Sequence, residues 1–434
     1  MNTRETLKVN NLNHLEIAGV DAVDLAKKYS TPLYVFDVNH IEKMCKTYAD
    51  TLNKYYGNGK IFYASKAFCC KQIYRIISKF GLGSDAVSLG EMYTSKKVNK
   101  TLKNVILHGN NKSKTEIEYA IKNSIGYIVI DSTEDLVQID QTAKKYKKIQ
   151  NVLIRVNPGI EAHTHKFIQT ATVDSKFGFS IDNGDALDII KNTIEYKNVK
   201  LLGLHCHIGS QIFEEKGFLL ALEKMTQFYA NVKNQLNYEF SVINMGGGLG
   251  IWYSDDDKKM TYTDYENFVK NICETLKENI KKLNLPSLYL MLEPGRSIVG
   301  EAGVTLYTVG SIKQIKGVKN YLAIDGGMFE NPRYALYQAK YTAVALEKMN
   351  DTPTINYSLA GKCCESGDII TENSILPIMK QGDLVGVLST GAYNYSMASN
   401  YNRNLVPKVV GVKDGKSFVM VKGQTLKDII KNDK

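Results

Sequence analysis

The run Ile61-Phe62-Tyr63-Ala64-Ser65 is short and apolar, and Lys66 follows it directly. A run of this length, rich in aromatic and β-branched residues, predicts a buried β-strand. Seven similar runs follow, and each ends in a polar residue or glycine before a helix-like amphipathic stretch. They cover residues 82–87, 104–108, 127–130, 152–156, 201–207, 242–245 and 288–292.

Alternating strands and helices predict parallel strands joined by right-handed crossovers. Eight such units predict an α/β fold, a TIM-type (β/α)8 barrel, over residues 33–300. An open doubly wound sheet is the alternative, but the count is eight and no G-x-G-x-x-G motif follows the first strand. Strand-like runs become denser afterwards, at residues 305–312, 321–324 and 383–388. We therefore expect a mostly β C-terminal domain at 301–434, with the N-terminal segment 1–32 packing against it.

The composition is that of a globular protein. Apolar residues make up 44% of the 434 residues and charged residues 23%, which excludes a disordered, collagen-like or coiled-coil chain. The net charge of +10 comes from scattered lysines, as at residues 144–148, and not from a dense arginine tract. This distribution indicates a solvated surface, argues against nucleic-acid binding, and suits small anionic ligands.

No uncharged apolar run reaches about 18 residues, the length needed to span a membrane. The N-terminus lacks the apolar core of a signal peptide, so we expect a cytoplasmic protein. The seven cysteines are odd in number and contain no C-x-x-C pair. This count argues against a disulfide framework or a zinc site, and we expect no bound metal.

Candidate chemistry gathers at the ends of the eight predicted strands, where barrel enzymes place their catalytic groups. Lys66 is the most informative of these residues, because a partly desolvated lysine with a lowered pKa attacks aldehydes. A surface lysine is the alternative. The predicted strand ends carry Lys66, Asp85, His108, Asp131, Arg155, His207, glycines 246–248 and Glu293.

Two loops near the last strands indicate a phosphate site. Gly246-Gly247-Gly248-Leu249-Gly250 would let backbone N–H groups approach a phosphate, and Glu293-Pro294-Gly295-Arg296 would place an acid beside it. A simple tight turn is the alternative. His205 and His207 point to the same side of their strand. A metal site would need further ligands, and the other paired histidines are His163 and His165. An imidazole stacked on a flat cofactor explains the segment better.

The segment Cys363-Cys364-Glu365-Ser366-Gly367-Asp368 places a thiol beside carboxylates. Negative neighbours raise a thiol pKa, and a neutral thiol is a proton donor. A buried structural cysteine is the alternative.

Together these segments resemble the pyridoxal-phosphate-dependent decarboxylases of the alanine-racemase-like barrel group. The resemblance runs over nearly the whole chain, and the order and spacing of its motifs are more specific than any one of them. It implies decarboxylation of meso-2,6-diaminopimelate to L-lysine and CO2, the last step of lysine biosynthesis. Further matching segments are Ser84-Asp85-Ala86-Val87, His108-Gly109-Asn110-Asn111-Lys112, Arg155-Val156-Asn157-Pro158-Gly159, Ser175-Lys176-Phe177-Gly178 and His207-Ile208-Gly209-Ser210-Gln211.

The resemblance also implies roles for individual residues. Lys66 would hold pyridoxal 5'-phosphate covalently, His207 would stack on its ring, and Glu293 would keep the ring nitrogen protonated. Cys364 would supply a proton from the partner subunit, which implies a homodimer with shared active sites. The other cofactor-binding residues would be Asp85, Ser210, Gly247, Gly248, Gly295, Arg296 and Tyr393. Substrate would be bound by Arg296, Arg333, Tyr337, Glu365 and Tyr393, of which an arginine grips a carboxylate bidentately.

Two segments depart from the family pattern, and three alternative functions are less consistent with the sequence. Tyr334 stands where the family usually has proline, and Gln169-Thr170-Ala171 replaces a usual Thr-Gly. Ornithine, arginine or carboxynorspermidine as substrate would leave Arg333 without a distal carboxylate to bind. Alanine racemisation is disfavoured because Glu293, and not an arginine, would face the ring nitrogen. A non-catalytic pyridoxal-phosphate carrier would be short and lack the β domain.

Overall fold

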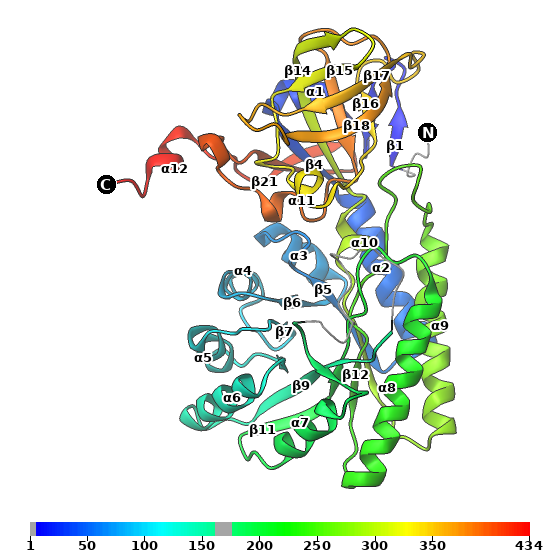
Figure 1. Cartoon of the computed structure of the whole chain (residues 1–434), viewed down its shortest axis with the longest axis vertical. Helices are drawn as coiled ribbons and strands as arrows, with labels where there is room; N and C mark the ends of the chain where they lie inside the picture. The colour runs from blue at the N-terminus through cyan, green and yellow to red at the C-terminus, as the bar shows by residue number, and fades with distance from the viewer. Residues whose placement is uncertain (1–5, 161–175) are drawn as a thin grey trace. The chain divides into compact units, whose positions relative to one another are not determined.

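The computed structural model describes residues 6–160 and 176–434. The chain forms two compact units. Figure 1 shows the whole chain, coloured by residue number from the N-terminus to the C-terminus. The β unit consists of Met1–Lys43, Ile251–Lys259 and Arg296–Lys434, and the barrel unit of Met44–Gly250 and Met260–Gly295. The expected domain boundaries at residues 33 and 301 stay a prediction.

The barrel unit is a closed ring of eight parallel strands, so the predicted TIM-type barrel is confirmed. The strand order is β9-β11-β12-β13-β5-β6-β7-β8, and β8 pairs with β9 again to close the ring. Each strand overlaps one predicted run. The strands are β5 (Gly59–Ala64), β6 (Gly83–Ala86), β7 (Val105–Leu107), β8 (Tyr127–Ile130), β9 (Gln150–Asn157), β11 (Val199–His205), β12 (Val242–Asn244) and β13 (Tyr289–Leu292). A further short strand, β10 (Phe179–Ser180), adds to β9.

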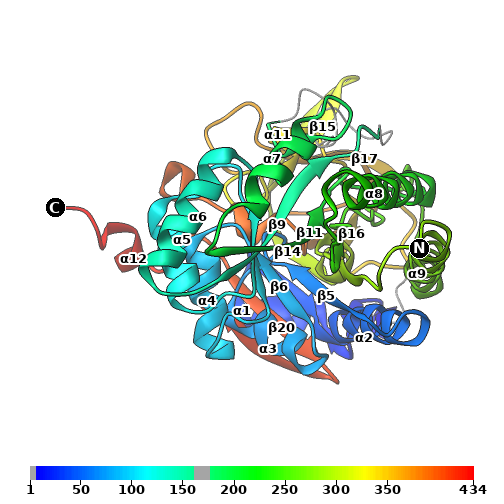
Figure 2. The ribbon, with the colours of Figure 1, turned by 90° about the horizontal axis from the view of Figure 1, so that it is seen from below.

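Helices lie around the outside of the barrel strands (Figure 2). Several begin at a serine or threonine that caps the first turn, and Ser113 and Thr261 form complete capping boxes. Their buried faces are apolar. The helices are α2 (Val38–Tyr55), α3 (Lys71–Lys79), α4 (Leu89–Asn99), α5 (Lys114–Lys122), α6 (Thr133–Lys145), α7 (Asp185–Ile194), α8 (Glu215–Leu236) and α9 (Tyr262–Lys282). No described helix is both long enough and apolar enough to span a bilayer.

The inside of the barrel is filled by apolar side chains and is not a pore. Phe62, Ile106, Val129, Leu153 and Met291 form one buried cluster within it. Because the strands are parallel, their carboxyl ends all lie at the same rim. That rim is where the polar residues that follow the strands are brought together.

The β unit is built around the long strand β14 (Gly303–Ile315), and the predicted mostly β C-terminal region is confirmed. One sheet has the order β18-β17-β15-β14-β4-β20-β21, and β19 pairs with both β14 and β16. The other strands are β4 (Leu33–Asp37), β15 (Lys319–Ile324), β16 (Ala343–Ala345), β17 (Ile355–Ala360), β18 (Ile369–Leu376), β19 (Leu384–Leu388), β20 (Lys408–Lys413) and β21 (Lys416–Val421).

The N-terminal segment contributes to the core of the β unit. It contains the hairpin strands β1 (Leu7–Val9), β2 (Leu15–Ile17) and β3 (Val20–Asp21), and helix α1 (Ala22–Tyr29). Leu15 and Leu25 share a buried cluster with Val304 and Val410. The remaining short helices are α10 (Arg296–Val299), α11 (Arg333–Tyr337), α12 (Leu426–Ile430), η2 (Tyr395–Met397) and η3 (Tyr401–Arg403).

Candidate active site

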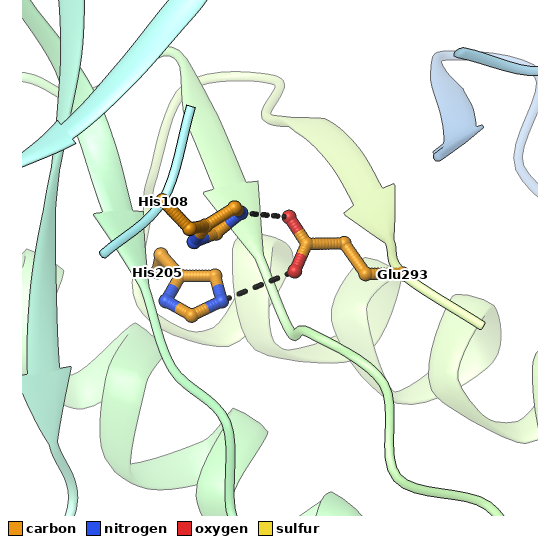
Figure 3. Close-up of side chains that lie close together, drawn as sticks. All are labelled: His108, His205 and Glu293. Atoms are coloured by element: carbon orange, nitrogen blue, oxygen red, sulfur yellow. Dashed lines mark hydrogen bonds and ion pairs between the residues drawn. The ribbon is translucent and has the colours of Figure 1, made fainter. Parts of the chain in front are cut away.

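A buried carboxylate, Glu293, is the centre of a polar cluster at the rim of the barrel (Figure 3). Glu293 follows β13 directly. Its Oε1 lies 2.9 Å from His108 Nε2 and accepts a 2.7 Å bond from Asn244 Nδ2. Its Oε2 lies 3.3 Å from His205 Nε2. Four strand ends therefore supply one cluster, because His108 follows β7, Asn244 ends β12 and His205 ends β11.

The surroundings of Glu293 keep it ionised. Burial alone would raise its pKa, but His108 and His205 outweigh this and hold the pKa of Glu293 well below its usual range. Burial lowers the pKa of His205 to about 4. His205 is therefore neutral near pH 7, and its Nε2 lies close to the carboxylate without a well-aligned hydrogen bond. The cluster thus holds an ionised carboxylate in a buried site.

The same three groups resemble a set of metal ligands. The ligand atoms of His108, His205 and Glu293 lie within 4.8 Å of one another. Two imidazoles and a carboxylate are ligands that zinc accepts. The expectation that no metal binds stays a prediction.

Lys66 and Asp85 lie on neighbouring strands of the same rim. The Ser65 backbone N–H donates to Asp85 Oδ1 at 2.9 Å, which ties the end of β5 to β6. Burial, and next the charge of Glu293, raise the pKa of Asp85 well above its usual range. The pKa values of the two carboxyl groups are thus pushed apart, that of Asp85 upward and that of Glu293 downward. Lys66 is exposed, and its expected role as a nucleophilic amine stays a prediction.

The glycine-rich loop packs so closely against neighbouring backbone that a side chain at Gly247 or Gly248 would collide with it. A Cβ on Gly247 would lie 2.0 Å from the Glu293 carbonyl oxygen, and one on Gly248 would lie 2.4 Å from that of Gly209. Gly248 also has a φ of +131°, which glycine adopts readily. The loop after β11, which carries His207 and Ser210, is half-buried at these two residues. Gly295 is buried two residues beyond Glu293.

A small cavity of about 10 Å³, with room for roughly one water molecule, adjoins this loop. Its lining is mainly apolar and includes Phe218, Phe268 and Ile272 from helices α8 and α9. Gly246–Leu249 also line this cavity, so the glycine-rich loop packs against apolar side chains.

Within the β unit, the predicted Arg296 and Arg333 are both 8% exposed and share an aromatic neighbour. Arg296 Nη1 donates to the hydroxyl of Tyr253, and the Arg296 Cζ lies 4.7 Å from the ring centroid of Tyr393. Arg333 Nη1 donates to the Tyr341 hydroxyl at 2.7 Å. Burial alone would lower the pKa of Arg333, but Tyr253 and Tyr341 raise it, so the guanidinium stays charged.

The other predicted residues of the β unit are exposed. Cys364, Glu365 and Tyr337 all face solvent, which excludes a buried structural role for Cys364. The Cys364 backbone N–H donates to Asn402 Oδ1 at 2.9 Å. The neighbouring Cys363 is half-buried, and burial followed by the Asp368 carboxylate raises its pKa to about 11. The expected effect of carboxylates on a thiol is thus seen at Cys363.

Three residues of these clusters were not predicted. Asn244 ends β12, so the rule that chemistry lies at strand ends applies to it, although the glycines that follow carry the stronger signal. Tyr253 and Tyr341 lie outside any motif, so the sequence held no signal for them. Of the segments noted in the sequence, His163, His165, residues 169–171 and Ser175 lie outside the described residues.

Comparison with known proteins agrees with the resemblance. The family model described as "Pyridoxal-dependent decarboxylase, pyridoxal binding domain" matches residues 38–300. The chain belongs to the pyridoxal-dependent decarboxylases. A similar member of these decarboxylases is the diaminopimelate decarboxylase of Bacillus subtilis, 44% identical over 428 residues, or 99% of this chain and 97% of that one. That of Staphylococcus aureus is 42% identical, covering 99% of both chains.

Solved structures of these decarboxylases have the same fold. A diaminopimelate decarboxylase from M. jannaschii, in a co-complex with L-lysine, matches with a TM-score of 0.90 and 32% identity, covering 99% of this chain and 98% of that one. The one from Helicobacter pylori, also complexed with L-lysine, has a TM-score of 0.84 and 27% identity, covering 95% and 98%. The predicted family and fold are therefore confirmed.

Proposed function

We propose that this pyridoxal-dependent decarboxylase converts meso-2,6-diaminopimelate to L-lysine and CO2. The observation that carries the proposal is the buried, ionised Glu293 held by two imidazoles at the barrel rim. The names of the full-length relatives support the choice of substrate, as do the two related structures that hold L-lysine.

The rim residues fit pyridoxal 5'-phosphate as a cofactor. Lys66 offers an exposed amine for the aldehyde, Glu293 a buried anion for the ring nitrogen, and the loop at Gly247 and Gly248 close backbone approach for the phosphate. When bound, the cofactor supplies an electron-accepting ring for the electron pair left as CO2 departs. We assign His207 to the face of the ring. We assign Ser210 and Gly295 to the phosphate site and Asp85 to the set of cofactor-binding residues, since its raised pKa disfavours a second negative charge beside Glu293.

From the family resemblance we also assign Arg296 and Tyr393 to the phosphate and to the substrate. For the far end of diaminopimelate, Arg333 would bind the distal carboxylate and Glu365 the distal ammonium, with Tyr337 beside them. A buried charged guanidinium is a strong carboxylate receptor. Ornithine and arginine carry no second carboxylate, so as substrates they would offer Arg333 no distal carboxylate to bind.

We assign to Cys364 the proton that replaces CO2 on the reacting carbon. Its thiol is exposed on the β unit, as a group offered to a second subunit must be. The proposal therefore includes a homodimer with shared active sites. The proposal also includes a cytoplasmic location.

Product analysis tests the proposal. Purified protein with added pyridoxal phosphate is offered meso-diaminopimelate, ornithine, arginine and carboxynorspermidine separately, and amine and CO2 are measured. We expect lysine and CO2 in equal amounts from diaminopimelate alone. Turnover of a polyamine precursor in its place would overturn the substrate assignment.

A further inference from the structure

One tyrosine of the β unit, Tyr253, contacts both buried arginines. Its ring centroid lies 5.6 Å from the Cζ of Arg296 and 4.7 Å from the Cζ of Arg333. The hydroxyl accepts a hydrogen bond from Arg296 Nη1. Tyr253 is 5% exposed, so these contacts lie away from solvent. A single side chain thus links the two guanidinium groups.

The backbone of Tyr253 is fixed from both directions. Its N–H donates to Asp257 Oδ2 at 3.1 Å, and its carbonyl accepts from the Thr342 backbone and hydroxyl, both at 3.0 Å. The ring packs edge-on against Tyr341, with centroids 5.4 Å apart and an interplanar angle of 90°. Tyr253 is therefore also held by contacts that do not involve the arginines.

Tyr341 holds Arg333 from another direction. Its hydroxyl accepts from Arg333 Nη1 at 2.7 Å and donates to Asn394 Oδ1 at 3.2 Å, and Asn394 Nδ2 donates to the Thr390 carbonyl at 3.1 Å. Arg333 thus has a hydroxyl partner of its own. Tyr253 gives Arg333 only its ring, whereas it gives Arg296 a hydroxyl acceptor.

This division separates two physical roles of Tyr253. Two like charges held near each other repel, and the π-face of a buried ring attracts each of them. A hydroxyl acceptor additionally fixes the direction in which a guanidinium presents its remaining N–H groups. Removing the hydroxyl should affect Arg296 first, and removing the ring should affect both arginines.

We propose that Tyr253 is a positioning residue that sets both anion-binding arginines, its hydroxyl orienting Arg296 toward the cofactor phosphate and its ring holding Arg333 for the distal carboxylate of the substrate. This inference rests on the proposed function and extends it, because it makes one uncharged residue responsible for the spacing of two anion sites.

The hydroxyl is tested with Tyr253→Phe. Pyridoxal phosphate and pyridoxal, which lacks the phosphate, are titrated into cofactor-free full-length protein, and binding is followed by the fluorescence of Trp252, the sole tryptophan. A hydrogen bond to a charged group predicts that the variant binds pyridoxal phosphate about tenfold more weakly. Its affinity for pyridoxal should stay within about twofold, because the lost bond acts only through the phosphate.

The ring is tested with Tyr253→Leu. L-lysine, which keeps the distal carboxylate, and cadaverine, which has no carboxylate, are compared as competitive inhibitors of diaminopimelate turnover by the loaded enzyme. Loss of a desolvated cation–π contact predicts that the Ki of lysine rises about tenfold while that of cadaverine changes less than about twofold. Tyr253→Phe, which keeps the ring, should leave the lysine-to-cadaverine ratio unchanged.

Tyr357→Phe is the matched control. Tyr357 is 2% exposed in the same unit, and its hydroxyl accepts only a backbone N–H, from Met379 at 3.3 Å, among its described bonds. If loss of any buried hydroxyl loosened the unit, Tyr357→Phe would also change ligand binding. The proposal predicts that this control leaves unchanged both the pyridoxal phosphate-to-pyridoxal affinity ratio and the lysine-to-cadaverine Ki ratio. Circular dichroism of each variant confirms that it is folded.

The outcomes separate this inference from the proposed function. If the unaltered protein neither binds pyridoxal phosphate nor decarboxylates diaminopimelate, the proposed function fails. If it does both, and Tyr253→Phe discriminates pyridoxal phosphate from pyridoxal as well as the unaltered protein does, the role of the hydroxyl is overturned. An unchanged lysine-to-cadaverine ratio in Tyr253→Leu would overturn the role of the ring.

Discussion

Replacing Glu330 by glutamine should change how the stability of the protein depends on pH. Glu330 is fully buried in the β unit, three residues before Arg333. Its Oε1 accepts from the Tyr307 hydroxyl at 2.6 Å and from the Gly327 N–H at 3.2 Å. Burial raises its pKa to about 8. Glutamine keeps the shape of the protonated acid and its acceptor oxygen but cannot titrate.

The magnitude follows from the two pKa values. Below about pH 4.5 the carboxyl group is protonated in both the folded and unfolded states, so it gives no pH dependence. Between that pH and about 8 only the folded state binds the proton, and its free energy of unfolding falls by about 1.4 kcal/mol for each pH unit. From pH 5 to pH 7 the unaltered protein should therefore lose roughly 3 kcal/mol that the Glu330→Gln variant keeps.

Urea unfolding measures this effect. Trp252 lies in the β unit, so its fluorescence follows the unit that contains Glu330. The free energy of unfolding is measured at pH 5, 6, 7 and 8 for both proteins, and the difference between them is plotted against pH. The subtraction removes every other titrating group that the substitution leaves unchanged.

A flat difference for Glu330→Gln between pH 5 and 7 would refute the reasoning. It would mean that Glu330 is ionised in the folded protein despite its burial. A difference of the opposite sign would mean that the folded state stabilises the carboxylate through groups other than Tyr307 and Gly327.

Three further predictions concern the candidate site. Lys66→Ala should lose the borohydride-reducible bond to pyridoxal phosphate, read by mass spectrometry, and a label on another lysine would contradict the assignment of Lys66. Cys364→Ala should lower turnover at least about 100-fold, while titration shows unchanged cofactor affinity; equal turnover would remove the thiol from the reaction. Asn244→Leu deletes the 2.7 Å bond to Glu293, so urea unfolding at pH 7 should show a loss of about 2 kcal/mol. A loss close to zero would show that the two histidines suffice to hold Glu293.

The barrel was predictable because its strands are short, continuous apolar runs. Such runs are typical of parallel strands that are buried on both faces. The rule that barrel chemistry lies at the carboxyl ends of strands then pointed to His108 and Glu293. The bond between them could not be predicted. It depends on which strands become neighbours around the ring and on how far each is staggered.

Exposure was the harder property to predict. Lys66 follows a fully buried residue, Ser65, yet its own side chain reaches solvent. Cys364 stands beside a half-buried cysteine and is itself exposed. Tyr253 lies 43 residues before Arg296, its hydrogen-bond partner, and no periodicity links the two. Such contacts come from tertiary packing, which a local pattern does not encode.

The pairing of β4 also has a consequence for synthesis on the ribosome. All five residues of β4 are buried, and the strand pairs with β14 on one side and β20 on the other. Both partners are translated only after the whole barrel, which at about 5–20 residues per second leaves β4 waiting for tens of seconds. During that time the nascent chain carries an apolar strand with two open edges, a target for chaperones and for mispairing between neighbouring polysomal chains.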